Sequence, residues 1–218
     1  MTLLYDIHTH HTPSPYDLKI RSIVNIDIFQ WGNPQQWCEQ SYYSLGIHPW
    51  NSISCDVQMD RLKRLAANER VVAIGETGID KLRGPSLDEQ LQLFIKQIEI
   101  AETVKKPLII HCVKAWNELI EVRRHTKPLQ PWIIHGYRGK PALTRQLVKE
   151  GFLFSIGYYF NEQSISLIPL SSLFCETDDG EKTIEEVYLH LGKALNVNME
   201  ELALRIEENI KRMMPIIV

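Results

Sequence analysis

The sequence predicts an α/β protein, a (β/α)8 TIM barrel of somewhat reduced size. Eight short apolar runs recur along the chain, and helical patterns lie between the later ones. Side chains that can bind a divalent cation stand at or just past the ends of several runs. In this barrel the carboxyl ends of all strands meet on one face, where catalytic residues gather. Scattered ligands at strand ends therefore predict one shared site.

Length and composition favour a single domain covering residues 1–218. A hydrophobic fraction of 44% and a charged fraction of 23% are ordinary for a globular protein with a sizeable core. The net charge of −3 argues against a surface that is basic throughout, but leaves a local basic rim open. No leader pattern and no run near the ~18 apolar residues of a membrane span are found. We expect a cytoplasmic protein without membrane contact, and nothing indicates an obligate protein partner.

The predicted strands are apolar almost throughout, as parallel strands covered on both faces are. In chain order they are Leu3–His8, Ile20–Ile28, Tyr42–Ile47, Val71–Gly75, Pro107–Cys112, Trp132–His135, Phe152–Tyr158 and Ser172–Glu176.

Helical spacing occupies most of the intervening segments. Ser86 and Glu89 form a capping box that opens a helix reaching Lys105, with Phe94, Ile95 and Ile98 on its broad apolar face. The other predicted helices are Asp56–Asn68, Ala115–His125, Pro141–Glu150, Ile184–Leu195 and Met199–Met213. Only about a dozen residues separate the first three strands from one another, too few for a full crossover helix. We expect short or irregular connections after strands one and two.

The candidate metal ligands come from five strand ends. They are His8, His10, Glu76, His111, His135 and Asp178. His8 and His10 are two residues apart on a strand, so their side chains share one face. Alone, such a pair is as well explained by two hydrogen-bonded histidines. The full set makes that explanation weaker, because so many charges and imidazoles in one barrel mouth are costly unless a cation offsets them.

Six ordered strings together resemble the TatD-type metal-dependent hydrolases, the deoxyribonuclease branch of the amidohydrolase-like barrels. The strings are Asp6-Ile-His-Thr-His10, Leu45-Gly-Ile-His-Pro49, Ile74-Gly-Glu-Thr-Gly-Ile-Asp80, Ile110-His-Cys112, Ile134-His-Gly136 and Cys175-Glu-Thr-Asp178. The chain departs from the family pattern after two ligands, at His111-Cys-Val113 and at Glu176-Thr-Asp-Asp-Gly-Glu181. It is also shorter than a usual member, so the substrate is less well indicated than the metal chemistry.

The resemblance implies two divalent ions. One would be held by His8, His10, Glu76 and Asp178, and the other by Glu76, His111 and His135, with Glu76 bridging. Histidine and carboxylate ligands suit Zn²⁺ or Mn²⁺, and a bridging carboxylate also accepts Mg²⁺. The resemblance also places His48 on the substrate side rather than among the core ligands.

The expected reaction is hydrolysis of DNA phosphodiesters by a metal-activated water. Glu76 and Asp178 are the expected catalytic residues, and Asp178 would orient the water or accept its proton. We expect the Asp6 carboxylate to accept a hydrogen bond from one of the metal-binding imidazoles and to fix its orientation. Basic residues in the loops after strands four to six are candidate phosphate contacts as a group, although a solvated surface charge is the commoner explanation for any single one. They are Lys81, Arg83, Lys114 and Arg138.

Two other functions remain open from the sequence. The same barrel could hydrolyse a small ester, lactone, amide or phosphoester, because the fold does not fix the substrate. A metal-stabilised scaffold without catalysis is the third possibility. Retention of every ligand type counts against the scaffold, which has no evident need for six such residues.

Overall fold

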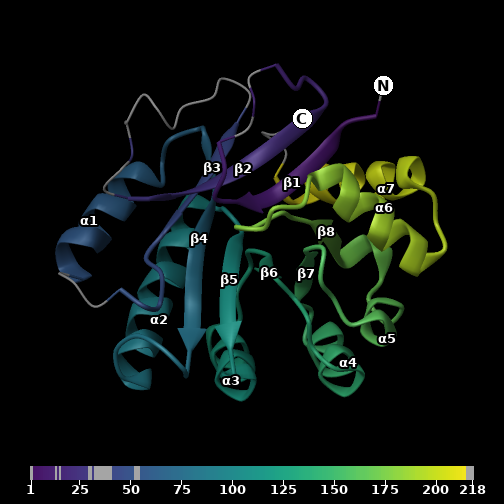
Figure 1. Ribbon diagram of the computed structural model, residues 1–218. Helices are drawn as coiled ribbons and strands as arrows, with labels where there is room; N and C mark the ends of the chain where they lie inside the picture. Colours follow the sequence, from purple (N-terminus) through teal and green to yellow (C-terminus); the bar gives the residue numbers. More distant parts are fainter. Residues whose placement is uncertain are drawn as a thin grey trace.

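The computed structural model describes residues 2–12, 14, 16–28, 31, 41–51 and 55–214. Its eight strands form one parallel sheet in chain order, with helices outside it (Figure 1). The strands are β1 (Leu4–Thr9), β2 (Ile20–Asp27), β3 (Tyr42–Gly46), β4 (Val71–Asp80), β5 (Leu108–Val113), β6 (Trp132–Ile134), β7 (Leu153–Ile156) and β8 (Leu173–Cys175). The (β/α)8 prediction is confirmed.

Backbone hydrogen bonds join the last strand end to the first. The amide of His10 donates to the carbonyl of Asp178 at 3.0 Å, and the amide of Asp178 donates to the carbonyl of His8 at 2.9 Å. These bonds close the barrel through the backbones of three candidate ligands. The strand pairing is irregular between Asp6 and Thr9, between Tyr43 and Ser44 and between Ile74 and Thr77. Such irregularities re-aim side chains near active sites.

Helices cover the outside from β3 onward. They are α1 (Cys55–Leu65), α2 (Leu87–Val104), α3 (Trp116–Thr126), α4 (Pro141–Lys149), α5 (Glu162–Ile165), α6 (Ile184–Leu195) and α7 (Met199–Met213), with a 3-10 turn at Leu170–Ser172. The described residues of the β1–β2 connection contain no helix, as predicted. Most of the β2–β3 connection lies outside the described residues. No helix in the described part of the chain is long and apolar enough to cross a bilayer.

Two local predictions were wrong. Strand β4 does not end at Gly75 but continues to Asp80, so Glu76 lies within a strand. On α2, the predicted apolar residue Ile95 is 38% exposed, whereas Gln90 and Gln97 are buried. In both cases polar residues are buried where the apolar pattern does not indicate it, Glu76 on β4 and the glutamines on α2.

The two buried glutamines of α2 fasten the ends of neighbouring strands. Gln97 Nε2 donates to the carbonyl of Ile47 at 3.0 Å, and the amide of Ile47 donates to Gln97 Oε1 at 2.7 Å. Gln90 makes the equivalent pair with Asp80, at 2.9 Å and 2.7 Å. Helix α2 therefore fixes the backbone beside His48 and at the end of β4.

Replacing Gln97 by methionine is expected to lower the free energy of unfolding by about 2–4 kcal/mol. The substitution leaves the buried amide and carbonyl of Ile47 without partners, and each costs about 1–3 kcal/mol. Chemical denaturation of the variant measures the loss. Gln92→Met is the matched control, because Gln92 lies on the same helix and is exposed. Equal stability of the two variants would contradict the assigned role.

Candidate metal centre

The structure brings all six candidate ligands to the carboxyl end of the barrel. His8 lies on β1 and is fully buried, and Glu76 on β4 is 7% exposed. His111 lies on β5, His135 follows β6 directly, and Asp178 follows β8. Asp178 has a φ of 56°, a left-handed conformation that Asp and Asn tolerate better than most residues.

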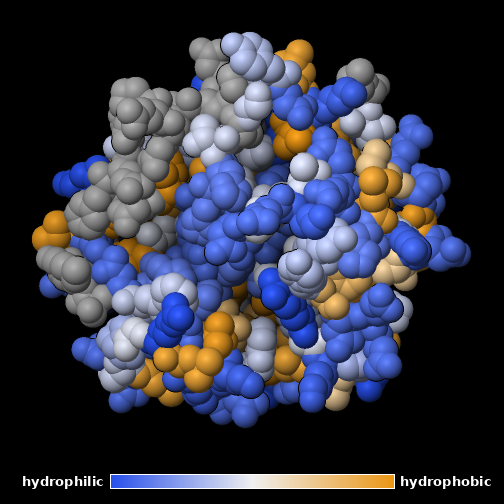
Figure 2. Space-filling view, viewed as in Figure 1, coloured by the Kyte–Doolittle hydropathy of each residue, from blue (hydrophilic) through white to orange (hydrophobic). Residues whose placement is uncertain are grey.

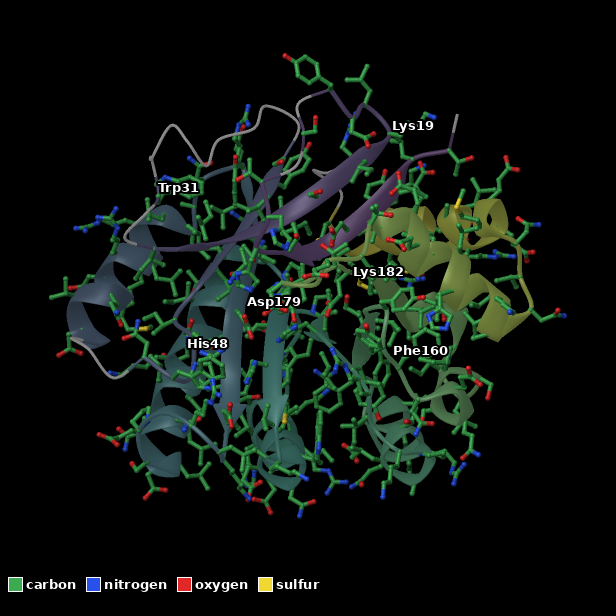
Figure 3. All side chains as sticks on the ribbon, in the orientation of Figure 1. Lys19, Trp31, His48, Phe160, Asp179 and Lys182 are labelled. Carbon is green, nitrogen blue, oxygen red and sulfur yellow. The ribbon has the colours of Figure 1, made fainter. Side chains whose placement is uncertain are left out.

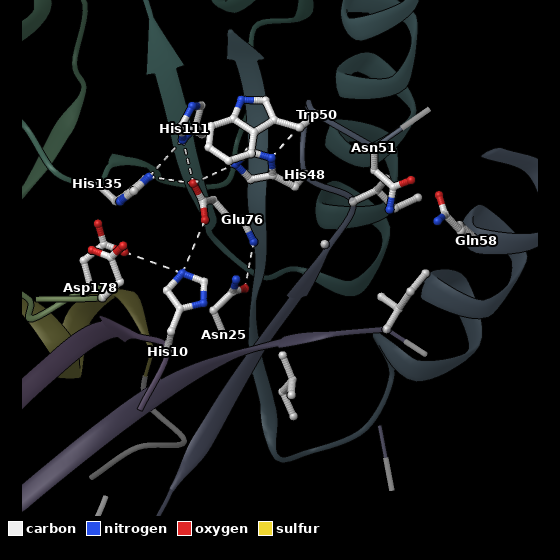
Figure 4. Close-up of a pocket in the computed structure, with 15 residues that line it drawn as sticks. His10, Asn25, His48, Trp50, Asn51, Gln58, Glu76, His111, His135 and Asp178 are labelled. Carbon is white, nitrogen blue, oxygen red and sulfur yellow. Dashed lines mark hydrogen bonds and ion pairs between the residues drawn. The ribbon is translucent and has the colours of Figure 1, made fainter. Parts of the chain in front are cut away.

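Glu76 stands at the centre of the cluster, and its two carboxylate oxygens face different histidines (Figure 4). Oε1 lies 2.6 Å from His111 Nδ1, 2.8 Å from His135 Nε2 and 3.2 Å from His48 Nε2. Oε2 lies 3.7 Å from both His8 Nε2 and His10 Nε2. The cluster is thus divided into two halves that share one carboxylate.

Asp178 completes the half of the cluster that contains His8 and His10. Its Oδ1 is 3.5 Å from the Nε2 atom of each. His8, His10 and Glu76 bring potential ligand atoms within 4.8 Å of one another, and Asp178 forms a second such group with His8 and His135. Both groups contain His8, and histidine and carboxylate donors of this kind suit a divalent ion.

An unsatisfied histidine supports the same interpretation. Both ring nitrogens of the fully buried His8 lack a hydrogen-bond partner. Buried polar atoms without partners are uncommon and need an explanation. A cation bound at Nε2 would satisfy this nitrogen, so the residues present fit a metal. Three groups within the cluster bring potential ligand atoms within 4.8 Å of each other, and one of them contains His48 with Glu76 and His111. His48 thus faces Glu76 as well as the cavity.

Carboxylates lie behind two histidines of the cluster, and one of them makes a hydrogen bond to its ring. Asp80 Oδ2 lies 3.2 Å from His111 Nε2, and because a carboxylate accepts, Nε2 carries the proton and Nδ1 is left for the site. Glu176 Oε1 lies 3.6 Å from His135 Nδ1 and accepts the amide of Gly136 at 2.5 Å. Trp50 Nε1 also donates to Asp80, at 2.5 Å.

The charges in the cluster shift several pKa values strongly. Burial raises the pKa of Glu76, but the charge of His135 and the neighbouring imidazoles of His10 and His111 outweigh it, so the pKa falls well below its usual range. For Asp178 burial is likewise outweighed, by the neighbouring imidazoles of His8 and His135, and the pKa falls to about 2. Both carboxylates are therefore ionised at neutral pH.

Sequence reasoning missed several residues that shape the site and misplaced one. Asn25 on β2 was missed; its Oδ1 accepts the amide of Glu76 at 2.9 Å. Asp80 and Glu176 were also not identified. Asp6, expected to fix an imidazole, instead accepts Thr177 Oγ1 at 2.6 Å and the Thr177 amide at 3.1 Å. It positions the segment that leads to Asp178. Burial raises the pKa of Asp6 to about 7, although the hydrogen bonds from Thr177 lower it.

A cavity of about 560 Å³ opens beside the cluster. Its lining includes His10, Asn25, His48, Trp50, Glu76, His111, His135, Asp178 and Asp179. The centre of this face is largely hydrophilic (Figure 2). Among the candidate phosphate contacts, Arg83, Lys114 and Arg138 are exposed. Lys81 differs from these three, because its Nζ forms an ion pair with Glu118 Oε1 at 2.5 Å.

Known proteins are similar to this chain in sequence and in fold. The chain is 30% identical to the uncharacterized metal-dependent hydrolase TatD of Mycobacterium tuberculosis, over 66% of this chain and 60% of that protein. It is 25% identical to the uncharacterized metal-dependent hydrolase YabD of Bacillus subtilis, over 97% of this chain and 98% of YabD. The crystal structure of YjjV, a TatD homolog from Escherichia coli, superposes with a TM-score of 0.80 at 22% identity, covering 97% of this chain and 98% of YjjV.

The sequence model of one family matches residues 34–215. That segment includes the strands β3 to β8 and four of the six candidate ligands, and His8 and His10 precede it. The chain belongs to the TatD related DNase family.

Proposed function

We propose that this protein hydrolyses phosphodiester bonds of DNA with divalent cations held by His8, His10, Glu76, His111, His135 and Asp178. The observation that carries the proposal is the position of Glu76, whose two oxygens each face a separate set of imidazole nitrogens. A carboxylate shared in this way suits a pair of cations. The donor set suits Zn²⁺ or Mn²⁺, and Mg²⁺ is also compatible.

Divalent cations at this centre would lower the pKa of an attacking water and offset the charge of a phosphate group. The chain supplies the remaining functions. Asp178 is 31% exposed at the cavity, and its Oδ1 faces His8 and His10. We assign to Asp178 Oδ2 the orientation of the water and acceptance of its proton. Asp80 holds His111 in one ring orientation.

The rim of the cavity supports a phosphate-containing substrate. Trp50 lines the cavity and is 44% exposed, and the guanidinium of Arg83 lies 4.7 Å from the centre of its ring. No ion pair joins Arg83 or Lys114 to an acid among the residues that the structure describes. Cations of this kind contact phosphates, and the indole is suited to stacking on a base. The family name, which is that of a DNase, agrees with this substrate class.

An assay of metal content and of substrate range tests the proposal. We expect purified protein to bind divalent metal and to cleave fluorescent DNA in Mg²⁺, Mn²⁺ or Zn²⁺. Treatment with a chelator should abolish cleavage, and added metal should restore it. A panel of carboxylic esters, lactones and simple phosphodiesters should be poorer substrates. Turnover of esters or lactones without DNA cleavage would support the small-substrate alternative. Failure to bind any divalent metal would contradict both the DNA hydrolase and the small-substrate hydrolase.

A further inference from the structure

A group of rings and cations lies on the loops after β6, β7 and β8, outside the cavity described above. The guanidinium of Arg138 lies 5.8 Å from the ring centre of Tyr159, and Lys182 Nζ lies 5.0 Å from that of Tyr158. The two tyrosine rings meet edge to face at 5.3 Å. These four residues, Arg138, Tyr158, Tyr159 and Lys182, are called the outer rim cluster.

Neighbouring elements hold the cluster in place. His190 on α6 contacts the Tyr158 ring at 4.6 Å, and its Nδ1 is 3.0 Å from the Tyr158 carbonyl. The hydroxyl of Ser164 on α5 donates to the carbonyl of Gly139 at 2.7 Å, which anchors the loop that carries Arg138. Contacts of this kind arrange the side chains before any ligand arrives, which lowers the entropic cost of binding.

Two members of the cluster are open to a ligand. Tyr159 is 64% exposed, and Arg138 is exposed without an ion pair to any residue in the described part of the chain. Lys182 differs, because its Nζ pairs with Glu186 at 2.7 Å. An exposed aromatic ring beside an available guanidinium offers a stacking surface for a base and a contact for a phosphate.

The cluster is covalently close to the metal centre. Arg138 follows the candidate ligand His135 by three residues, and Lys182 follows Asp178 by four. Four extended residues span at most about 14 Å, a distance that a few nucleotides of a single strand can cover. In Figure 3, His48 lies on one side of Asp179, and Lys182 and Phe160 lie on the other. A strand crossing the site from Trp50 and Arg83 could thus reach this cluster.

We propose that the outer rim cluster is a second binding subsite, which holds a nucleotide flanking the scissile bond of a single-stranded substrate. Tyr159 stacks on the base, and Arg138 contacts the adjoining phosphate. Tyr158 and Lys182 position these two residues. This inference rests on the proposed function of the metal centre, and it concerns substrate length rather than the chemical step.

Binding measured in EDTA tests the subsite separately from catalysis. Fluorescence anisotropy of labelled oligothymidylates compares a trinucleotide with a dodecanucleotide. We expect Tyr159→Ala to weaken binding of the dodecanucleotide by about fivefold or more, as loss of one base stack does, and Tyr159→Phe to retain it. Arg138→Gln should lower the slope of log affinity against log salt by about 0.7. Trinucleotide binding should change less than twofold in every variant.

Matched controls are Tyr16→Ala and Arg145→Gln, because Tyr16 is 92% exposed in the β1–β2 connection and Arg145 is exposed on α4. Equal binding of the dodecanucleotide by the rim variants, the controls and the wild type would overturn the subsite. Wild-type cleavage of DNA in that same case would leave the proposed function standing. A wild-type protein that neither binds nor cleaves DNA would overturn both.

Discussion

Glu76→Gln is expected to abolish hydrolysis almost completely, by about 10²- to 10³-fold or more in kcat. The amide removes a negative charge that faces five imidazole nitrogens, at 2.6–3.2 Å from Oε1 and 3.7 Å from Oε2. It also removes the one carboxylate shared by both halves of the cluster. We therefore expect the variant to bind less divalent metal per chain than the wild type, measured by elemental analysis after dialysis.

Glu181→Gln is the matched control for this substitution. Glu181 is exposed in the loop after β8, so the same chemical change occurs on the same face without a contact to the cluster. The control should retain wild-type metal content and activity. A Glu76→Gln protein that melts like the wild type, binds as much metal and hydrolyses substrate within tenfold of the wild-type rate would contradict the central role of Glu76.

The positions of the ligands could be predicted because the barrel imposes them. Strands of a parallel barrel deliver their carboxyl ends to one face, so residues at five separate strand ends must meet. His111 and His135 illustrate this, since they are 24 residues apart in sequence, yet both lie within hydrogen-bond distance of the same oxygen of Glu76. Local apolar runs were sufficient to locate such strands.

The residues behind the ligands could not be predicted in the same way. Asp80 and Trp50 act through side-chain directions and strand register, which hydrophobic periodicity does not specify. Strand β4 shows the physical reason. Its end contains Glu76, Thr77 and Asp80, a composition typical of a loop, yet these side chains are buried because imidazoles, an indole and backbone amides satisfy the polar atoms of both carboxylates. Gln90 and Gln97 are buried for a similar reason, because strand-end backbone groups need partners.

Asp178→Asn is expected to lower kcat by about 10²- to 10⁴-fold, the usual contribution of a positioned proton acceptor. Asparagine tolerates the left-handed conformation of this residue, whose φ is 56°, so the backbone should be preserved. The remaining donors, His8, His10 and Glu76, still face one another, and saturating metal should restore the stoichiometry. If Asp178 served only as a metal ligand, saturating metal would also restore kcat.

Asp179→Asn separates the effect of Asp178 from a general loss of negative charge. Asp179 is the next residue and lines the same cavity, but it belongs to none of the groups of potential ligand atoms found among the described residues. We expect Asp179→Asn to change kcat less than fivefold. With metal saturated in both variants, metal occupancy no longer differs between them. A rate defect confined to Asp178→Asn would then identify Asp178 as the acceptor of the proton from the attacking water. Recovery of Asp178→Asn to within a few-fold of the wild type would limit Asp178 to holding the metal.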